Sequence, residues 1–192
     1  EETFIGPTAC AVAPNGDIVI ADGHWPRPST AQQDGDRLVQ ITTDGKFVRA
    51  VGSLGSGPGE FMGPHSLAFD SRGRLFVADR SNNRVQLFDQ EGNHLATWTQ
   101  FGRPSGIYFD NNDQIYVADS ESDDLQNPGW EMGIRIGDAE RGWVTAFVLY
   151  QWGDPRSPMG NGAEFVAVDR EGNMYAGEPR PRRLQKYVRV RP

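Results

Sequence analysis

The chain has 192 residues, of which 26 are acidic and 19 are basic, so its formal charge is −7. It contains 23 glycines and 13 prolines but keeps 10% aromatic residues, a combination that predicts a turn-rich, packed domain and excludes a disordered chain. The acidic balance argues against general affinity for nucleic acid, no apolar run approaches the roughly 18 residues of a membrane-spanning helix, and the single cysteine, Cys10, cannot form an internal disulfide.

Four segments along the chain share one pattern. Each starts with small residues or proline, passes through an alternating apolar run, turns at Gly or Asp, and returns through a second apolar run that ends in an acid. The segments are GPTACAVAPNGDIVIADG, GPHSLAFDSRGRLFVADR, RPSGIYFDNNDQIYVADS and GAEFVAVDREGNMYAGEP. The closing acids are Asp22, Asp79, Asp119 and Glu178, at spacings of 57, 40 and 59 residues. The shortest spacing is the bare repeat, and the other two intervals carry insertions.

A second pair of runs follows each closing acid. These runs are DRLVQITTDGKFVRAVG, NRVQLFDQEGNHLATWT, GIRIGDAERGWVTAFVL and RRLQKYVRV, and the first two break at Asp44-Gly45 and Glu91-Gly92. Alternating apolar runs broken at such dipeptides are typical of β-hairpins. Each repeat therefore predicts four antiparallel strands, and the chain lacks sustained helical periodicity.

A repeat of about 40 residues with four strands is typical of a β-propeller blade. The predicted fold class is all-β, a β-propeller of about four blades in a single domain or propeller fragment over residues 1–192. The predicted blades cover approximately residues 1–52, 60–99, 100–149 and 160–192. Cys10 falls on the first strand of its blade and is expected to be a small core residue.

The segment GSGPGEFMGPHSLAFDSRGRLFVADRSNNRVQLFDQEGNHLATW carries the most specific motifs. It has a Gly-Pro-Gly-x-Phe lead-in, a Pro-x-x-hydrophobic-x-hydrophobic-Asp strand, a Val-Ala-Asp close and an Asn-x-Arg-hydrophobic-Gln strand. These features resemble an NHL repeat, and the other three copies fit the same pattern. Propellers of that family usually have five or six blades. Four blades can close tightly, pair with a partner or be part of a longer chain, and the last is the expectation that we favour.

Four equivalent residues are expected at the channel mouth, where the innermost strand of each blade begins. They are Thr8, His65, Ser105 and Glu164. Loops at this end form the usual ligand face of a propeller. Ser105 is therefore a candidate for substrate binding.

Within NHL proteins the chain is similar to the lyase family that cleaves peptidyl-α-hydroxyglycine in peptide amidation, in which three histidines hold zinc. GPHSLAF matches one histidine motif, so the resemblance implies that His65 is a metal ligand; Glu164 stands where a second motif falls. It also implies catalytic roles for Arg80, which follows Val-Ala-Asp, and for His24, which stands where the family has a tyrosine. Zinc is the cofactor implied, whereas the family's calcium-binding acid is replaced by Phe165.

Each candidate also has a structural interpretation. His65 can cap the entrance of its strand, Arg80 can pair with a carboxylate of the adjacent blade, and Glu164 can accept hydrogen bonds from strand-end amides. His24 lies in an insertion that can simply be a rigid loop. The closing acids are expected to bind backbone amides in the turn after the second strand.

Two inserted segments, DGHWPRPSTAQQDGD and SESDDLQNPGWEMG, follow closing acids and are expected to project from the same side. Each carries one tryptophan, Trp25 or Trp130, beside proline and charged residues. Exposed aromatic side chains on paired loops suit the binding of a peptide or sugar, so both are candidates for substrate binding. Packing of each tryptophan against its own loop is the alternative.

The last 14 residues, PRPRRLQKYVRVRP, hold five arginines, one lysine and no acid, which leaves −13 for the other 178 residues. The alternation in RLQKYVRV indicates a paired strand, so nucleic acid is not an expected partner. Open blade edges predict self-association. The first residues lack the features of a signal peptide, and the expectation of a periplasmic or secreted location comes from the resemblance alone.

Two functions follow from these observations. The first is an NHL propeller that binds a peptide, protein or small ligand through its channel-mouth loops. The alternative is a metal-dependent lyase or hydrolase of the amidating-lyase type, with zinc on His65 and Glu164 and with Arg80 stabilising charge on the reacting oxygen.

Overall fold

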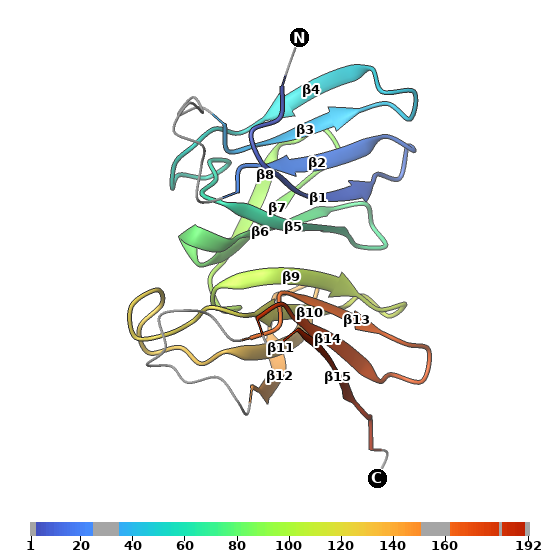
Figure 1. The fold of residues 1–192 in the computed structure, drawn as a ribbon. Coiled ribbons are helices and arrows are strands. Elements are labelled where there is room, and N and C mark those ends of the chain that lie inside the picture. Colours follow the sequence, from blue (N-terminus) through green and yellow to red (C-terminus); the bar gives the residue numbers. More distant parts are fainter. Residues whose placement is uncertain (1–2, 25–34, 151–161, 181, 191–192) are drawn as a thin grey trace. The chain divides into compact units, whose positions relative to one another are not determined.

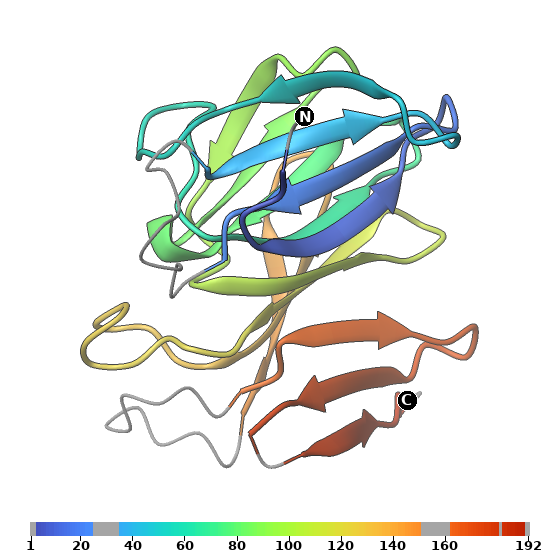
Figure 2. The same cartoon turned by 45° about the horizontal axis from the view of Figure 1, so that its top comes forward.

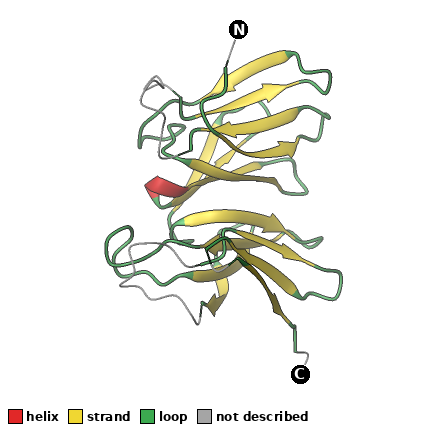
Figure 3. Ribbon diagram, viewed as in Figure 1, coloured by secondary structure: helices red, strands yellow, loops and turns green. Residues whose placement is uncertain are grey.

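A computed structural model describes residues 3–24, 35–150, 162–180 and 182–190, and these residues form an all-β fold (Figure 1). Among them, the one helical element is a short 3-10 helix, η1 (Arg80–Asn82) (Figure 3). The prediction of an all-β chain is thus confirmed. No helix in the described ranges is long and apolar enough to cross a membrane.

The strands form four antiparallel sheets, which we call blades 1 to 4. Blade 1 contains β1 (Pro7–Val12), β2 (Ile18–Asp22), β3 (Arg37–Ile41) and β4 (Phe47–Val51). Blade 2 contains β5 (Pro64–Phe69), β6 (Leu75–Asp79), β7 (Arg84–Phe88) and β8 (His94–Trp98). Blade 3 contains β9 (Pro104–Phe109), β10 (Gln114–Asp119), β11 (Gly133–Asp138) and β12 (Val144–Leu149). Blade 4 contains β13 (Phe165–Val168), β14 (Met174–Glu178) and β15 (Arg183–Tyr187).

Within each blade, every strand pairs with the next along the chain, which is the meander of a β-propeller blade. Blades 1 to 3 have the four strands that the repeat predicts, and blade 4 has three in the described part of the chain. The chain divides into two compact units, Glu1–Trp98 with blades 1 and 2, and Thr99–Pro192 with blades 3 and 4. We call them unit 1 and unit 2.

In unit 1 the inner strands β1 and β5 lie side by side (Figures 1 and 2). The facing sides of blades 1 and 2 bury an apolar core that contains Val19, Leu38, Leu75, Val77 and Phe88. Alternation along β1 turns Ala9 and Ala11 toward this core and leaves Cys10 on the other face. The expectation that Cys10 is a core residue is therefore wrong, because its side chain is exposed.

In unit 2 the inner strands β9 and β13 are in contact, and the aromatic residues of the core between blades 3 and 4 are tyrosines. Tyr116, Ile134, Met174 and Ala176 are buried there, with Tyr108 packed against them. Both units thus use one plan, in which a blade buries one face of its sheet against the next blade.

An aspartate follows the inner strand in blades 2, 3 and 4 and fixes the turn into the second strand. Asp70 Oδ1 accepts hydrogen bonds from the amides of Arg72 (3.1 Å) and Arg74 (2.8 Å). Asp110 and Asp169 bind the corresponding amides of their own turns. These turns are the Gly- and Asp-containing breaks that the sequence predicts.

Candidate ligand-binding site at the starts of the inner strands

Three predicted mouth residues occupy equivalent positions in the blades. Thr8, His65 and Ser105 are the second residues of β1, β5 and β9, and in each strand the pairing register skips this residue. The skipped residue forms a β-bulge, which bends the strand and re-aims the side chain. Glu164 lies directly before β13, and its amide donates to the Gly177 carbonyl at 2.9 Å.

His24 and His65 come together in unit 1, although 41 positions separate them in the sequence. Their ring centroids are 5.7 Å apart and the rings are inclined by 44°. His24 is exposed and His65 is half-buried. We call this arrangement the histidine pair.

Backbone contacts hold the histidine pair in place. The amide of His24 donates to the Gly6 carbonyl at 3.1 Å, which anchors it to the lead-in of β1. Thr8 Oγ1 donates to the Pro64 carbonyl at 2.6 Å, one residue before His65. The inner strands β1 and β5 are thereby fixed at the end where the histidine pair lies.

The buried Asp36 joins the loops on either side of the histidine pair. Its Oδ2 accepts a hydrogen bond from the Gly63 amide at 3.1 Å, just before β5 begins. At Gly23, beside His24, φ is +151° and a Cβ atom would lie 2.0 Å from Asp36 Oδ1. Glycine is therefore required at this position.

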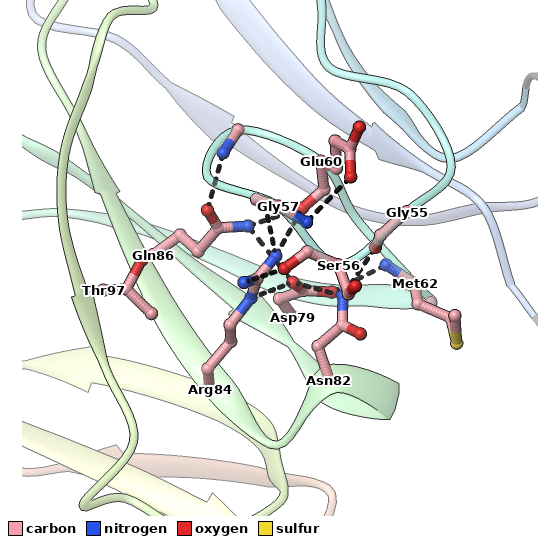
Figure 4. A network of polar contacts seen from close by, with 12 residues as sticks. Gly55, Ser56, Gly57, Glu60, Met62, Asp79, Asn82, Arg84, Gln86 and Thr97 are labelled. Atoms are coloured by element: carbon pink, nitrogen blue, oxygen red, sulfur yellow. Dashed lines mark hydrogen bonds and ion pairs between the residues drawn. The ribbon is translucent and has the colours of Figure 1, made fainter.

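The closing acid of blade 2 holds the loop that leads to His65 (Figure 4). Asp79 Oδ1 accepts from the Met62 amide at 2.7 Å, and Oδ2 accepts from Arg84 Nε (2.7 Å) and Asn82 Nδ2 (2.8 Å). Burial raises the pKa of Asp79, while these hydrogen bonds oppose the rise. The carboxylate thus fixes the start of β5 through charge-assisted bonds.

Arg84 extends this network to the loop between β4 and β5. Its guanidinium donates to the carbonyls of Ser56 (2.6 Å), Gly57 (2.8 Å) and Glu60 (2.8 Å). Because these bonds consume the donors of a buried arginine, the loop is rigid at its base. Rigidity here preorganises the neighbouring His65.

Acid–arginine pairs recur in all four blades. Arg37 Nε lies 3.5 Å from Asp22 Oδ2, Arg135 Nη1 lies 3.1 Å from Asp119 Oδ2, and Arg183 pairs with Glu178. The sequence reasoning missed these pairs, although an arginine stands at the start of each third run, in DRLV, NRVQ, GIRI and RRLQ. That recurrence is the signal that could have revealed them.

The backbone partners of the closing acids differ in part from the prediction. Asp22 binds the amides of Ile5 (2.8 Å) and Gly6 (2.7 Å), which precede the inner strand rather than follow the second strand. Asp119 binds both kinds of amide, that of Arg103 before β9 and that of Ser122 in the following turn. The acids of blades 1 to 3 therefore tie the entry of the blade to its second strand.

Arg80 lies at the same end of blade 2 as His65. It begins η1 directly after Asp79, and its side chain is buried, with 6% of the residue exposed. The amide of Ser81 donates to the Met62 carbonyl at 2.9 Å, so η1 lies beside the lead-in of β5. A catalytic role for Arg80 stays a prediction.

In unit 2 the bulged Ser105 is buried at 1% exposure, and its Oγ lies 2.7 Å from Ser120 Oγ. Glu164 is half-buried. Its carbonyl oxygen lies close to β9, because a Cβ atom added at Gly106 would be 2.7 Å from the Glu164 oxygen. The structure therefore brings Ser105 and Glu164 to one end of unit 2. Their roles in substrate and metal binding stay predictions.

Trp130 lies beside Arg135 of β11, the strand that follows its loop, and its role in substrate binding stays a prediction. The guanidinium of Arg135 lies 4.8 Å from its ring and 4.5 Å from the ring of Phe147. Burial lowers the pKa of Arg135, whereas the charge of Asp119 opposes that change. Trp25, the other predicted aromatic contact, lies outside the described residues.

The comparisons with known proteins agree with the blade architecture. The NHL repeat model matches residues 61–88 and 101–123, which contain the bulged His65 and Ser105. Human NHL repeat-containing protein 3 is 30% identical over 194 residues, covering 96% of this chain and 50% of the relative. The chain belongs to the NHL-repeat proteins.

Other relatives of this NHL-repeat chain include enzymes. A Caenorhabditis elegans protein named "Probable peptidyl-alpha-hydroxyglycine alpha-amidating lyase pgal-1" is 34% identical over 88 residues, covering 44% of this chain and 23% of that protein. The solved structure of a streptogramin B lyase matches with a TM-score of 0.58 at 15% identity, over 97% of this chain and 55% of that one. This last likeness concerns the fold alone. The NHL-repeat chain spans about half the length of human NHL repeat-containing protein 3.

The histidine pair consists of side chains of a type that can bind zinc. Catalytic zinc sites use three protein ligands, and His24 and His65 offer two imidazoles at one place. In the described part of the chain, no group of three or more His, Cys, Asp or Glu side chains is arranged to hold a metal ion. Glu164, the other predicted ligand, belongs to unit 2.

Proposed function

We propose that this NHL-repeat chain binds a peptide, protein or small ligand through the loops at the starts of its inner strands, with the histidine pair of unit 1 at the centre of the site. The observation that carries the proposal is the 5.7 Å approach of His24 and His65. Two imidazoles at that separation offer hydrogen-bond donors and acceptors to one ligand group.

The surroundings of the histidine pair suit recognition by preorganised polar groups. Asp36 and Asp79 fix the adjoining loops by hydrogen bonds to backbone amides. Arg80, at the same end of blade 2, adds a positive charge. Because imidazole N–H groups near a positive charge favour acceptor groups, we expect a ligand with a carboxylate or several carbonyl oxygens.

A titration with matched peptides tests this function. The probes are one short peptide with a free C-terminal carboxylate and the same peptide with a C-terminal amide, each followed by calorimetry and by NMR shifts of the His24 and His65 ring protons. We expect the carboxylate form to bind more tightly and His65→Ala to weaken it about tenfold, the usual effect of losing one good polar contact.

His94 provides the matched control, since it lies on β8 and contacts Thr97 and Phe88 instead of the histidine pair. His94→Ala should leave peptide affinity unchanged. Equal affinities for wild type, His65→Ala and His24→Ala would contradict the proposal.

The histidine pair also favours a second candidate, a metal-dependent lyase or hydrolase similar to the amidating lyase. Zinc, when bound, would act as a Lewis acid toward a substrate oxygen. Within unit 1, His24 and His65 would contribute ligands. Arg80 would stabilise negative charge on the reacting oxygen.

Metal content separates the two candidates. Protein purified without added zinc should contain one zinc per chain if the enzyme proposal holds, and His65→Ala should lose it. An α-hydroxyglycine peptide should then be cleaved to its amide and an aldehyde. Zinc that is substoichiometric and insensitive to His65→Ala would remove the enzyme proposal and leave the binding proposal intact.

We also propose that the protein self-associates and that it is periplasmic or secreted. Blade 4 leaves Phe165 57% exposed and Leu184 61% exposed. Leu38 and Ile134, the equivalents of Leu184 in blades 1 and 3, are 3% and 2% exposed. Apolar exposure of this size on a sheet face supports association with another surface.

A further inference from the structure

The outer strand of blade 3, β12, is an open edge without charged side chains. It pairs with β11 on one side, and no strand in the described part of the chain pairs with its other side. Its sequence, VTAFVL, contains no titratable residue. An uncharged edge strand can pair with another chain, because its outward backbone N–H and C=O groups have no strand partner.

The outermost described strand of every other blade carries a charged or titratable residue. In blade 1, β4 holds Arg49, and in blade 2, β8 begins with His94. In blade 4, β15 holds Arg183 and Lys186. Charged residues on an edge oppose its pairing with an identical edge, because like charges come close together. Among the described blades, blade 3 is therefore the one whose outer edge lacks this protection.

The side chains of β12 and of the residue before it leave apolar surface in solvent. Val144 is 38% exposed, Phe147 41% and Leu149 50%, and Trp143, directly before the strand, is 62% exposed. Single exposed apolar residues are ordinary, but four within seven consecutive positions form a patch. This patch provides apolar area that a partner at the β12 edge would bury.

Contacts inside blade 3 hold β12 in place. Val148 packs against the core between blades 3 and 4. Phe147 stands opposite Arg135 in the register, and the Arg135 guanidinium lies 4.5 Å from the Phe147 ring. A Cβ atom at Gly133 would lie 2.5 Å from that ring, so the glycine leaves room for it. Because the strand and its aromatic side chain are already fixed, pairing at this edge needs little reorganisation.

A bulge limits the regular part of the β12 edge. The register of β11 and β12 shifts between Ile136 and Gly137, so Thr145 has no direct partner on β11. From Ala146 to Leu149 the pairing with β11 is continuous. A bulge twists and disrupts a strand locally, so the segment after Thr145 is the part of β12 that suits pairing with a further strand.

We propose that β12 pairs with β12 of a second copy of this chain, which joins two four-stranded blades into one sheet. Two identical edges related by a twofold axis run antiparallel, and every residue of the paired segment then meets an uncharged residue. The same faces of the two copies lie on one side of the joined sheet, so the exposed Phe147 and Leu149 side chains of both copies come together.

A second copy fits this edge because it supplies a strand that is uncharged and has an open side. Among the strands that the structure describes at the outside of a blade, β12 meets both conditions, whereas β4, β8 and β15 fail the first. The inference rests on the proposed self-association and names its surface. Blade 4, with the exposed Phe165 and Leu184, is the competing surface.

Analytical ultracentrifugation of the whole chain over a range of concentrations tests the inference. We expect a monomer–dimer equilibrium with a dissociation constant on the order of 100 μM, because the paired segment is short. Leu149→Lys should raise this constant at least about tenfold, since it brings two ammonium groups together across the pair. Leu95→Lys is the matched control, because Leu95 is also 50% exposed but lies on β8, and it should leave the constant unchanged.

Leu184→Lys, on β15, separates the two surfaces. Association that is lost in Leu149→Lys and kept in Leu184→Lys would support pairing through β12. Association that is kept in Leu149→Lys and lost in Leu184→Lys would overturn the inference and leave the proposed self-association intact, with blade 4 as its surface. A wild-type chain that stays monomeric at every concentration would overturn both.

Hydrogen exchange of the wild-type chain keeps the test open if Leu149→Lys fails to fold. Backbone amides of β12 that point away from β11 should exchange at least about tenfold more slowly well above the dissociation constant than well below it. Amides of β4 and β8 should exchange at the same rates at both concentrations. Equal rates for the β12 amides in monomer and dimer would overturn the inference.

Discussion

Units 1 and 2 contain the same repeated blades but differ at both ends of their inner strands. At the bulge, unit 1 carries His65 with His24 5.7 Å away, whereas unit 2 carries the buried pair of Ser105 and Ser120. At the other end, unit 1 leaves a pocket beside Val19, whereas unit 2 fills the equivalent space with Tyr116. The comparison teaches that the acids, arginines and turns build the same blade in both units. The units differ in the residue at the bulge and in the residue at the position of Val19 and Tyr116, three residues before the closing acid.

The largest expected effect comes from the acid–arginine pair, which recurs in the blades of both units. Asp79→Ala leaves Arg84 buried without its carboxylate and frees the Met62 amide. Removing one partner of a buried pair costs about 3–5 kcal/mol of unfolding free energy. Urea denaturation of the variant should show this loss directly.

Asp44→Ala is the control for that experiment. Asp44 forms an exposed ion pair with Lys46, at 2.7 Å, on a turn of blade 1. An exposed pair contributes little, so the urea midpoint should stay where it is in the wild type. If Asp79→Ala unfolded at the same midpoint, the acid–arginine pair would not be what holds the blade.

An intermediate effect is expected where the units differ, at Tyr116. Tyr116→Val removes a buried ring from the core between blades 3 and 4, which should lower the unfolding free energy by about 2–4 kcal/mol. Tyr116→Phe removes only the hydroxyl and should cost about 1 kcal/mol. Thermal unfolding followed by circular dichroism measures both variants.

Equal stabilities of Tyr116→Val and Tyr116→Phe would show that the ring is not needed to fill unit 2. Units 1 and 2 would then differ in the residue at this position but not in how that residue contributes to stability. If Tyr116→Val is much less stable than Tyr116→Phe, the aromatic ring itself is needed to fill the core of unit 2.

The smallest expected effect concerns a turn of unit 2. Hydrogen bonds from Asn173, together with that from the Tyr175 hydroxyl, lower the pKa of Asp169 to about 2, from an ordinary value of 3.8. Because the pKa is lowered in the folded state, its stabilising contribution is present above about pH 4 and is lost as the pH falls toward 2.

A carboxyl-carbon NMR titration measures this pKa, and Asn173→Ala should raise it toward 3.8. Asn112→Ala, on an exposed part of the equivalent turn in blade 3, is the control and should leave the titration of Asp169 unchanged. If the pKa of Asp169 stayed near 2 in Asn173→Ala, the backbone amides of the turn, and not the Asn173 side chain, would be what lowers it.

Much of the fold follows from local sequence patterns. Alternating apolar residues define the strands, and the closing acids define the repeat, because both are properties of one blade. The equivalent positions of Thr8, His65 and Ser105 could also be predicted by counting within each repeat. The bulges at these positions could not, since a skipped residue depends on how a strand pairs with its neighbour.

The candidate site was predictable only in part. His24 and His65 were each selected from the sequence, but for separate roles, and their 5.7 Å approach depends on the packing of blade 1 against blade 2. The role of Trp130 was left open for the same reason, because its contact with Arg135 joins a loop to a strand five residues later. Contacts between elements are not encoded in the periodicity of either element.

By itself, the sequence determined that this protein is an all-β chain of repeated NHL-type blades with an acid at the end of each second strand. The tertiary structure decided how equivalent positions are packed, because the contacts of a side chain such as Val19 or Tyr116 are made with residues of the facing blade. Strand formation is a short-range consequence of alternation and turns, whereas a pocket or a histidine pair exists only where two blades pack.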